Sequence, residues 1–330
     1  MIRITEADNI KYKLTVVTFM LSRVADSIFW MARYMERTNG MLRLLRTNYV
    51  ASQSEEKAFS WRSVLLTYGD MQPRQIDELE FSSQKVMEHL LHDKENNSSV
   101  INNITQAREN ARAVQDHITK EVWQCLNEYY HLIRDRNIQE QVSFGDPLSA
   151  LDTLIRHGML YHGTVDTTMS REEGFNFLNI GKFLERTIVS ADMINIKLAE
   201  VNYNLHLPNE APQWRYLLYS LSGYEFYMRT YRGNMQPDHV LQQVLYSNLF
   251  PHSVVYCLEQ ISRYFARLKT ESLPENYDQL EFLIGRLTTN VKYSRMEVNE
   301  GKYLQQFLMQ TRRELLEISK SFSQYYFGYS

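Results

Sequence analysis

The sequence predicts an all-α protein, built as a long antiparallel helical bundle with two pseudo-equivalent halves. Helix-breaking residues are few, with 12 Gly and 7 Pro among 330 residues, whereas Leu, Glu, Gln, Arg and Met, which favour helix, are common. Apolar residues recur at steps of three and four, the spacing that puts them on one face of a helix. No segment shows the alternating pattern of a half-buried strand between hairpin turns.

The first predicted helix begins near Leu21. Its apolar positions continue at helical spacing to Tyr49, and Ser22 is the expected N-cap, because a serine hydroxyl can accept a hydrogen bond from a free N–H of the first turn. Residues 1–19 are expected to form a separate arm or a start-site extension, and residues 20–330 a single helical domain.

Turn residues place the other helices. Ser98 or Ser99 can cap a helix that continues to about Asp135, since this stretch has neither Gly nor Pro. Residues 136–148 are expected to form a loop. Further helices are expected at 171–201, 212–231, 237–249, 251–270, 276–290 and 301–324. The prolines fall between these segments or at their starts, where the missing N–H does no harm. The aromatic C-terminal end, FSQYYFGYS, could dock on a partner or pack on its own bundle.

A short phrase occurs twice in the chain. Residues 21–38 read LSRVADSIFWMARYMERT and residues 169–187 read MSREEGFNFLNIGKFLERT, and one inserted residue brings them into register. Each copy contains Ser-Arg and ends in an aromatic residue, an apolar residue and Glu-Arg-Thr. The repeat predicts two equivalent helices that bring charge to one place.

The Glu-Arg pairs of the repeat are Glu36 with Arg37 and Glu185 with Arg186. Adjacent residues on a helix diverge by about 100°, so a glutamate and the arginine next to it do not face one another. A pseudo-twofold axis between the repeats would make the pairing reciprocal, Glu36 with Arg186 and Glu185 with Arg37. The small residues that would let another helix approach closely are Ala32, Gly40 and Gly181.

Two interpretations of these charges are open. Buried reciprocal ion pairs can set the register of helices without binding anything. Alternatively, the excess of cations over the two glutamates holds a carboxylate or phosphate, which the fork of an arginine grips with two hydrogen bonds. The candidate ligand-binding residues are Arg23, Arg33, Arg37, Arg108, Arg112, Arg171 and Arg186. For Arg108 and Arg112, four residues apart on one helix face, a solvated surface is the default.

Several classes of function find no support in the sequence. Net charge is −3 with basic and acidic residues interspersed, which argues against a nucleic-acid surface. Only Glu128 with His131 fits the Glu-x-x-His motif, which a di-iron site needs twice, so no metal and no cofactor are expected. Cys125 and Cys257 are expected to be buried, reduced thiols. Since no run of about 18 apolar residues occurs, we expect a cytoplasmic protein that does not span a membrane.

The chain resembles the bacterial alpha-E family, helical proteins named for a Glu-Arg motif. The resemblance extends from about Met20 to the C-terminal helix. Three residues depart from the family pattern: Lys182 stands in place of an arginine, Thr187 in place of a small apolar residue, and His252 in place of the arginine of a Phe-Pro-Arg-Ser-like stretch. An anion site at His252 would be weakened or pH-dependent. The stretches that carry the resemblance are MLSRVADSIFWMARYMERT at 20–38, ARENARAVQDHITKEVWQCLN at 107–127, HGTVDTTMSREEGFNFLNIGKFLER at 162–186 and LFPHSVVYCL at 249–258.

The family resemblance implies a functional context. Such proteins are associated, by gene neighbourhood and sometimes by fusion, with circularly permuted ATP-grasp proteins and transglutaminase-like proteins. This implies an accessory or binding component of a pathway that forms or modifies peptide or amide bonds, with an Arg/Glu site for an anionic group. One alternative is an enzyme of that pathway with Glu36 or Glu185 as general base, which requires a carboxyl pKa raised by burial. The other is a purely structural interaction protein.

Overall fold

The computed structural model describes residues 20–53, 59–68, 71–205, 211–269, 277–294 and 301–328. All regular secondary structure in these residues is helical, so the all-α prediction is confirmed. The predicted arm at residues 1–19 lies outside the described residues. The first elements are α1 (Ser22–Ser52), α2 (Arg62–Tyr68), α3 (Pro73–Leu79), α4 (Ser83–Leu91), α5 (Val100–Ala113), the 3₁₀ turn η2 (Gln115–His117), α6 (Lys120–Ile133), α7 (Arg136–Phe144) and α8 (Pro147–Thr168). The others are α9 (Glu173–Glu200), α10 (Ala211–Ser220), α11 (Tyr224–Tyr231), α12 (Pro237–Leu241), the π-helical turn η3 (Gln242–Tyr246), α13 (Val254–Ala266), α14 (Tyr277–Lys292) and α15 (Gly301–Tyr325).

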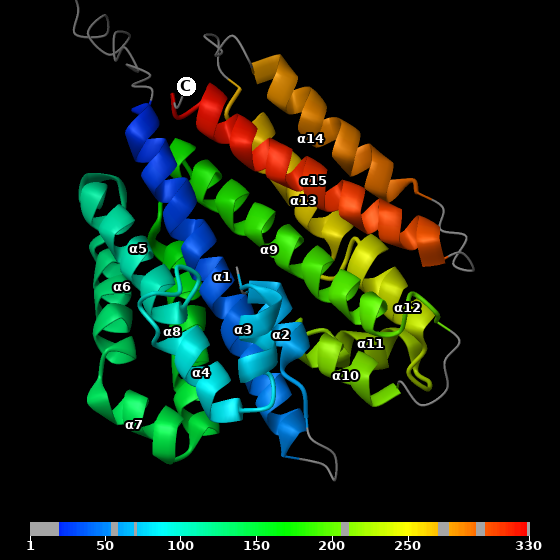
Figure 1. Ribbon diagram of the computed structural model, residues 1–330. Coiled ribbons are helices and arrows are strands. Elements are labelled where there is room, and N and C mark those ends of the chain that lie inside the picture. Colours follow the sequence, from blue (N-terminus) through cyan, green and yellow to red (C-terminus); the bar gives the residue numbers. More distant parts are fainter. Residues whose placement is uncertain are drawn as a thin grey trace, which may run out of the picture.

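Helices α1 and α9, which carry the two repeats, lie side by side at the centre of the molecule (Figure 1). The Met20 N–H donates to Glu173 at the start of the pair, and Gly40 meets Val189 two-thirds of the way along α1. The two helices therefore run parallel, unlike the antiparallel packing expected from the sequence. A parallel pair is possible because α2–α8 return the chain to the end at which α1 began. The equivalence of the two halves around the pair stays a prediction.

The central pair is packed closely at Gly181. A Cβ atom on this residue would lie 2.4 Å from the carbonyl oxygen of Phe29, so no side chain fits without moving the backbone of one helix. This contact brings the Glu-Arg segments of α1 and α9 opposite one another. On either side, α5 and α8 cover α1, and α13 and α15 cover α9 (Figure 1).

The long helix expected from Ser98 or Ser99 to Asp135 is two helices. Ser99 is the N-cap of α5, as predicted, but α5 ends at Ala113 and α6 starts after a new cap, the Thr119 hydroxyl, which accepts from the N–H of Val122. The two helices pack against each other as a hairpin. A threonine cap needs neither Gly nor Pro, so their absence from this stretch did not reveal the break.

The prediction of a loop at residues 136–148 is wrong. Most of it is α7, and the Asp135 carboxylate caps this helix by accepting from the N–H of Asn137. Asp146 then caps α8, with Pro147 in its first turn, where proline is well tolerated. Helix α8 itself had no counterpart among the predicted elements, nor had α2, α3 and α4. At the first helix, Leu21 and not Ser22 occupies the N-cap position, without a side-chain hydrogen bond.

One cluster of buried apolar residues extends from Ala25 to Phe327. At its C-terminal end the ring of Phe327 packs against Phe29, with the ring centroids 5.3 Å apart, so this part of the aromatic tail packs on its own bundle. In the described part of the chain, no helix is both long and apolar enough to cross a lipid bilayer.

Candidate functional site

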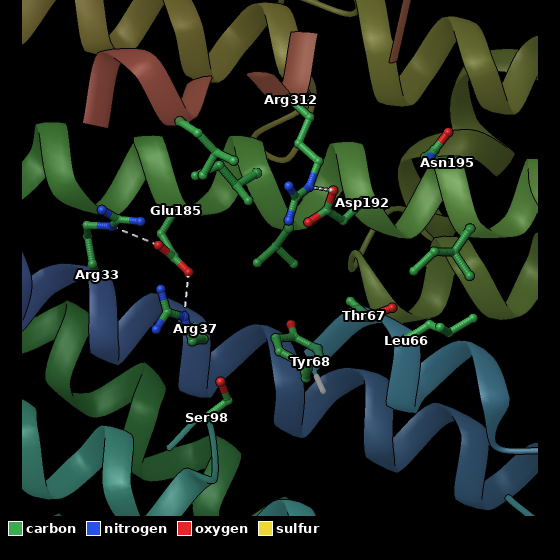
Figure 2. A pocket seen from close by; sticks show the side chains of 14 residues that line it. Arg33, Arg37, Leu66, Thr67, Tyr68, Ser98, Glu185, Asp192, Asn195 and Arg312 are labelled. Carbon is green, nitrogen blue, oxygen red and sulfur yellow. Dashed lines mark hydrogen bonds and ion pairs between the residues drawn. The ribbon is translucent and has the colours of Figure 1, made fainter. Parts of the chain in front are cut away.

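The carboxylate of Glu185 on α9 receives two guanidinium groups from α1. The Nε of Arg33 donates to Oε2 at 2.8 Å, and the Nε of Arg37 donates to Oε1 at 2.6 Å (Figure 2). Arg33 also donates to the Ser319 hydroxyl on α15. Glu185 and Arg33 are both buried, whereas the Arg37 side chain keeps 23% of its exposure. The positions of Arg33 and Arg37, four residues apart on α1, let both reach one acceptor.

Glu36 on α1 makes the reciprocal contact. Nε and Nη2 of Arg186 donate to the two oxygens of Glu36 at 2.6 and 3.0 Å, a bidentate pair. The Nε2 of His162 lies 3.4 Å from the same carboxylate. The pairing predicted from the repeat, Glu36 with Arg186 and Glu185 with Arg37, is confirmed.

The ion pairs keep both carboxylates ionised. Burial alone would raise the pKa of Glu36, but the charge and hydrogen bonds of Arg186 outweigh burial and bring this pKa to about 2. Burial opposes ionisation of Glu185 in the same way, and Arg37 and Arg33 hold its pKa below the ordinary value. A general base that works near neutral pH needs the opposite shift. The raised carboxyl pKa that the enzyme hypothesis requires is therefore not found at Glu36 or Glu185.

A pocket of about 540 Å³ opens beside the Glu185 pair. Helices α1, α2, α9 and α15 contribute to its wall, and Figure 2 shows the labelled side chains around one space. The polar residues of the wall include Arg33, Arg37, Tyr68, Glu185, Asp192 and Arg312. Asp192 and Arg312 form a second ion pair, with Arg312 Nε donating to Asp192 Oδ1 at 2.7 Å. Three arginines thus face two carboxylates, which leaves one positive charge in excess.

Two groups of this pocket have unused hydrogen-bonding capacity. Arg37 uses only its Nε, and its two terminal nitrogens have no acceptor among the described residues. The Tyr68 hydroxyl likewise has no hydrogen-bond partner in the described part of the chain, although Tyr68 is only 6% exposed. Burial raises the pKa of Tyr68 well above its usual value, so the hydroxyl keeps its proton. Its position depends on Gly40, because a Cβ there would lie 2.6 Å from the tyrosine oxygen.

The surroundings of Glu36 carry histidines and a lysine. Burial lowers the pKa of His162 to about 4 and that of His252 to about 3, so both rings are neutral at pH 7. Burial, together with the charge of Arg186, lowers the pKa of Lys182 to about 8. The family resemblance implies an arginine at position 252. The neutral ring of His252 adds no positive charge beside Arg186, whereas an arginine there would.

These histidines predict a loss of stability in acid. An unfolded histidine has a pKa near 6.5, whereas folded His162 and His252 have pKa values of about 4 and 3. The unfolded chain therefore binds more protons below pH 6.5, and the free energy of unfolding falls as the pH drops from 6.5 toward 4. Glu36, with a folded pKa of about 2 against 4.5, adds a further loss below pH 4.5. Urea unfolding at pH 8, 7, 6 and 5 measures the effect.

The double variant His162→Gln, His252→Gln is the control for this pH dependence. It removes both depressed pKa values while Arg186 still pairs with Glu36, so its stability should change less between pH 7 and pH 5 than that of the wild type. If the free energy of unfolding changed by the same amount between pH 7 and pH 5 in both proteins, the role of these histidines would be contradicted.

The other arginines of the candidate set do not line the pocket. Arg23 is exposed near the start of α1. Arg108 donates to Asn127 and Glu109, and Arg112 pairs with the same Glu109. Arg171 pairs with Asp166 and lies over the Phe175 ring. Arg186 is committed to Glu36. Of the predicted set, only Arg33 and Arg37 reach the pocket.

Sequence reasoning missed Tyr68, Asp192 and Arg312. A signal existed for Asp192, which follows Glu185 by seven residues and so lies two helical turns farther along the same face. None existed for Tyr68 or Arg312, which come from distant elements. Regarding metals, the described residues contain no group of three or more His, Cys, Asp or Glu side chains that could hold an ion. Cys125 and Cys257 are both buried and free.

A family model described as a predicted alpha-helical domain with a conserved ER motif matches residues 20–327. The match includes both Glu-Arg pairs, at 36–37 and 185–186, and nearly the whole described chain. No curated protein and no solved structure matches this sequence.

Proposed function

The chain belongs to the Alpha-E family, and from this premise we propose that it is an accessory, ligand-binding component of an ATP-grasp-linked pathway that forms or modifies peptide or amide bonds in the bacterial cytoplasm. Its partners are a circularly permuted ATP-grasp protein and a transglutaminase-like protein. The pocket beside Glu185 receives an anionic group of the molecule that these proteins make or modify.

The observation that supports the proposal is the free outer edge of Arg37. Its Nε is held by Glu185, which orients the guanidinium and leaves the two terminal nitrogens without an acceptor in the described residues. Arg37 lies in the wall of a pocket of about 540 Å³ with one excess positive charge. Such an edge suits a carboxylate or phosphate oxygen. The Glu-Arg pair then has two roles, holding α1 to α9 and positioning an arginine.

The alternatives receive less support from the same geometry. An enzyme with Glu36 or Glu185 as general base would need a raised carboxyl pKa, and both are lowered. A purely structural protein would account for the ion pairs, yet it gives no reason for a buried Tyr68 hydroxyl that lines a pocket without a hydrogen-bond partner among the described side chains.

Co-purification tests the accessory role. The full chain, tagged in its native host, is expected to enrich an ATP-grasp protein in quantitative mass spectrometry, compared with a tag-only control. The host that lacks this gene should also lose an amide-bonded product, detected by comparing metabolite extracts. A folded wild-type chain that enriches neither expected partner would overturn the accessory role.

Two variants test whether the function depends on the pocket. In the host that lacks the gene, Arg37→Gln should fail to restore the amide-bonded product. Arg23→Gln, a change of the same type at an exposed position on the same helix, should restore it. Arg37 is preferred to Glu185 for this experiment, because Glu185 keeps Arg33 when Arg37 is removed, and the fold is less disturbed. If the Arg37→Gln variant restored the product, the function would not depend on the pocket.

A further inference from the structure

A second group of charged and titratable side chains surrounds Glu36, outside the pocket beside Glu185. Its members come from α1, α8, α9 and the turn that precedes α13, and none of them lines that pocket. Each of them lies close enough to others of the group for their charges to act on one another. This Glu36 cluster consists of Glu36, Arg43, His162, Lys182, Arg186 and His252.

Arg186 is the centre of the Glu36 cluster. Its Nε and Nη2 donate to the Glu36 carboxylate, whereas Nη1, at the exposed edge, lies 3.4 Å from the carbonyl oxygen of Pro251. This contact places the next residue, His252, beside the outer edge of the guanidinium. Lys182 precedes Arg186 by four residues on α9, the spacing that puts two side chains on one helix face. Lys182, the outer edge of Arg186 and His252 therefore border one site.

Two donors of this site are unused. Lys182 and His252 make no hydrogen bond or ion pair with any described residue, and both are partly exposed, so solvent reaches their side-chain nitrogens. The Lys182 ammonium lies over the ring of Phe183, 4.6 Å from its centroid. Cations that are withdrawn from water are ordinarily paired with a group of opposite charge. An ammonium in this position without an acceptor therefore indicates a ligand.

The Glu36 cluster carries two more positive than negative charges at pH 7. Its three cations face one carboxylate, since the lowered Lys182 pKa of about 8 still keeps the ammonium protonated. Arg43 donates only to uncharged side chains in the part of the chain that the structure describes. Both histidines are neutral. Asp166 also acts on Lys182, but it pairs with Arg171 and leaves the balance unchanged.

We propose that the Glu36 cluster binds a doubly charged phosphate group at the outer edge of Arg186. Lys182 Nζ and Arg186 Nη1 donate to its oxygens, and the His252 ring donates its single N–H. Arg43 adds positive charge without direct contact. The two excess positive charges match a dianion, whereas a carboxylate would leave one of them uncompensated. Glu36 stays on the inner side of Arg186, where it is only 3% exposed.

The two copies of the repeat differ at the position that sets the charge of the site. Arg37 and Arg186 are equivalent in the repeat, and each has its Nε held by a glutamate. Four residues before Arg37 stands Arg33, which is committed to Glu185. Four residues before Arg186 stands Lys182, which has no partner among the described side chains. The second copy therefore has the larger excess of positive charge and suits the dianion.

Isothermal titration calorimetry on the isolated full chain at pH 7 tests the proposal. The probes are inorganic phosphate, glycerol 3-phosphate and acetate. Both phosphates should bind at least about tenfold more tightly than acetate, which brings a single charge. Tighter binding of glycerol 3-phosphate would identify the ligand as a phosphate ester, and tighter binding of inorganic phosphate would identify it as the free ion. Equal binding of acetate and both phosphates, or no binding of either phosphate at millimolar concentration, would overturn the proposal.

Substitutions of Lys182 locate the phosphate. Lys182→Gln should weaken the binding of both phosphates about tenfold or more, whereas Lys182→Arg keeps the charge and should retain most of the binding. Since Lys182 has no partner in the described residues, Lys182→Gln leaves no group unpaired and should fold, which circular dichroism checks. Lys320→Gln, the same change at an exposed position of α15, is the matched control and should bind like the wild type. Equal phosphate binding by Lys182→Gln and Lys320→Gln would contradict the site.

Arg37→Gln separates this site from the proposed function. It removes the arginine edge of the pocket beside Glu185 and should still bind phosphate, and adding Lys182→Gln to it should remove that binding. Phosphate binding that is lost in Arg37→Gln and kept in Lys182→Gln would place the anion in the pocket and reject this inference. Partner enrichment without phosphate binding would keep the accessory role and reject this site. Phosphate binding without partner enrichment would keep this site and reject the accessory role.

Discussion

Replacing Glu185 by glutamine is expected to lower the free energy of unfolding by about 3–5 kcal/mol. Arg33 is only 4% exposed, and among the described residues its guanidinium donates to Glu185 and to the Ser319 hydroxyl alone. Without the carboxylate, this buried cation has no counter-charge in the described part of the chain, and Arg37 loses its anchor as well. The measurement is urea unfolding followed by circular dichroism, with the midpoint and slope compared between variant and wild type.

Asp152→Asn is the matched control for the Glu185 substitution. Asp152 also pairs with an arginine of α1, Arg46, but both side chains are more than 40% exposed. An exposed pair of this kind contributes about 1 kcal/mol or less. If Glu185→Gln unfolded at the same urea concentration as Asp152→Asn, the buried pair would not be what holds α1 to α9.

Replacing Gly181 by alanine is expected to lower the free energy of unfolding by about 3 kcal/mol, the upper end of typical overpacking costs. The new Cβ would lie 2.4 Å from the Phe29 carbonyl oxygen. This atom belongs to the backbone of α1 and cannot turn aside as the end of a side chain can. The two central helices must therefore separate, which also lengthens the reciprocal ion pairs. Urea unfolding measures the loss.

Gly163→Ala makes the same chemical change in α8 and should have the opposite sign. A Cβ at Gly163 has no heavy atom within 4 Å, and alanine is favoured over glycine in a helix interior by about 1 kcal/mol. The variant is therefore expected to be slightly more stable than the wild type. A Gly181→Ala protein as stable as Gly163→Ala would show that the central helices can separate freely.

Element boundaries were predictable where apolar spacing and proline agreed. The second repeat was expected to lie in a helix at 171–201, and α9 runs from Glu173 to Glu200. The failures have local causes. The break between α5 and α6 depends on the cap of Thr119, and the helix α7 depends on the cap of Asp135. Each cap is one short polar side chain, and the same residue type serves as well in a turn or on an exposed helix face.

The candidate site likewise has one part that the sequence predicts and one part that it does not. The reciprocal pairing of Glu36 with Arg186 and of Glu185 with Arg37 was predictable, because two similar helices in contact must exchange equivalent partners. The pocket was not predictable, since Tyr68 comes from α2 and Arg312 from α15. In charge and spacing, Arg37 resembles Arg108, Arg112 and Arg171. These three arginines nevertheless pair with residues outside the pocket.

By itself, the sequence determined that this protein is helical, that two of its helices are similar, and which charges they exchange. These properties follow from local periodicity, which decides the residues that share a helix face. Only the tertiary structure decided that α1 and α9 run parallel, that Glu185 faces a pocket, and that Glu36 faces His162. Which element covers a helix face depends on how the chain returns across more than 100 residues between α1 and α9. That path results from packing of the whole core, which no local pattern encodes.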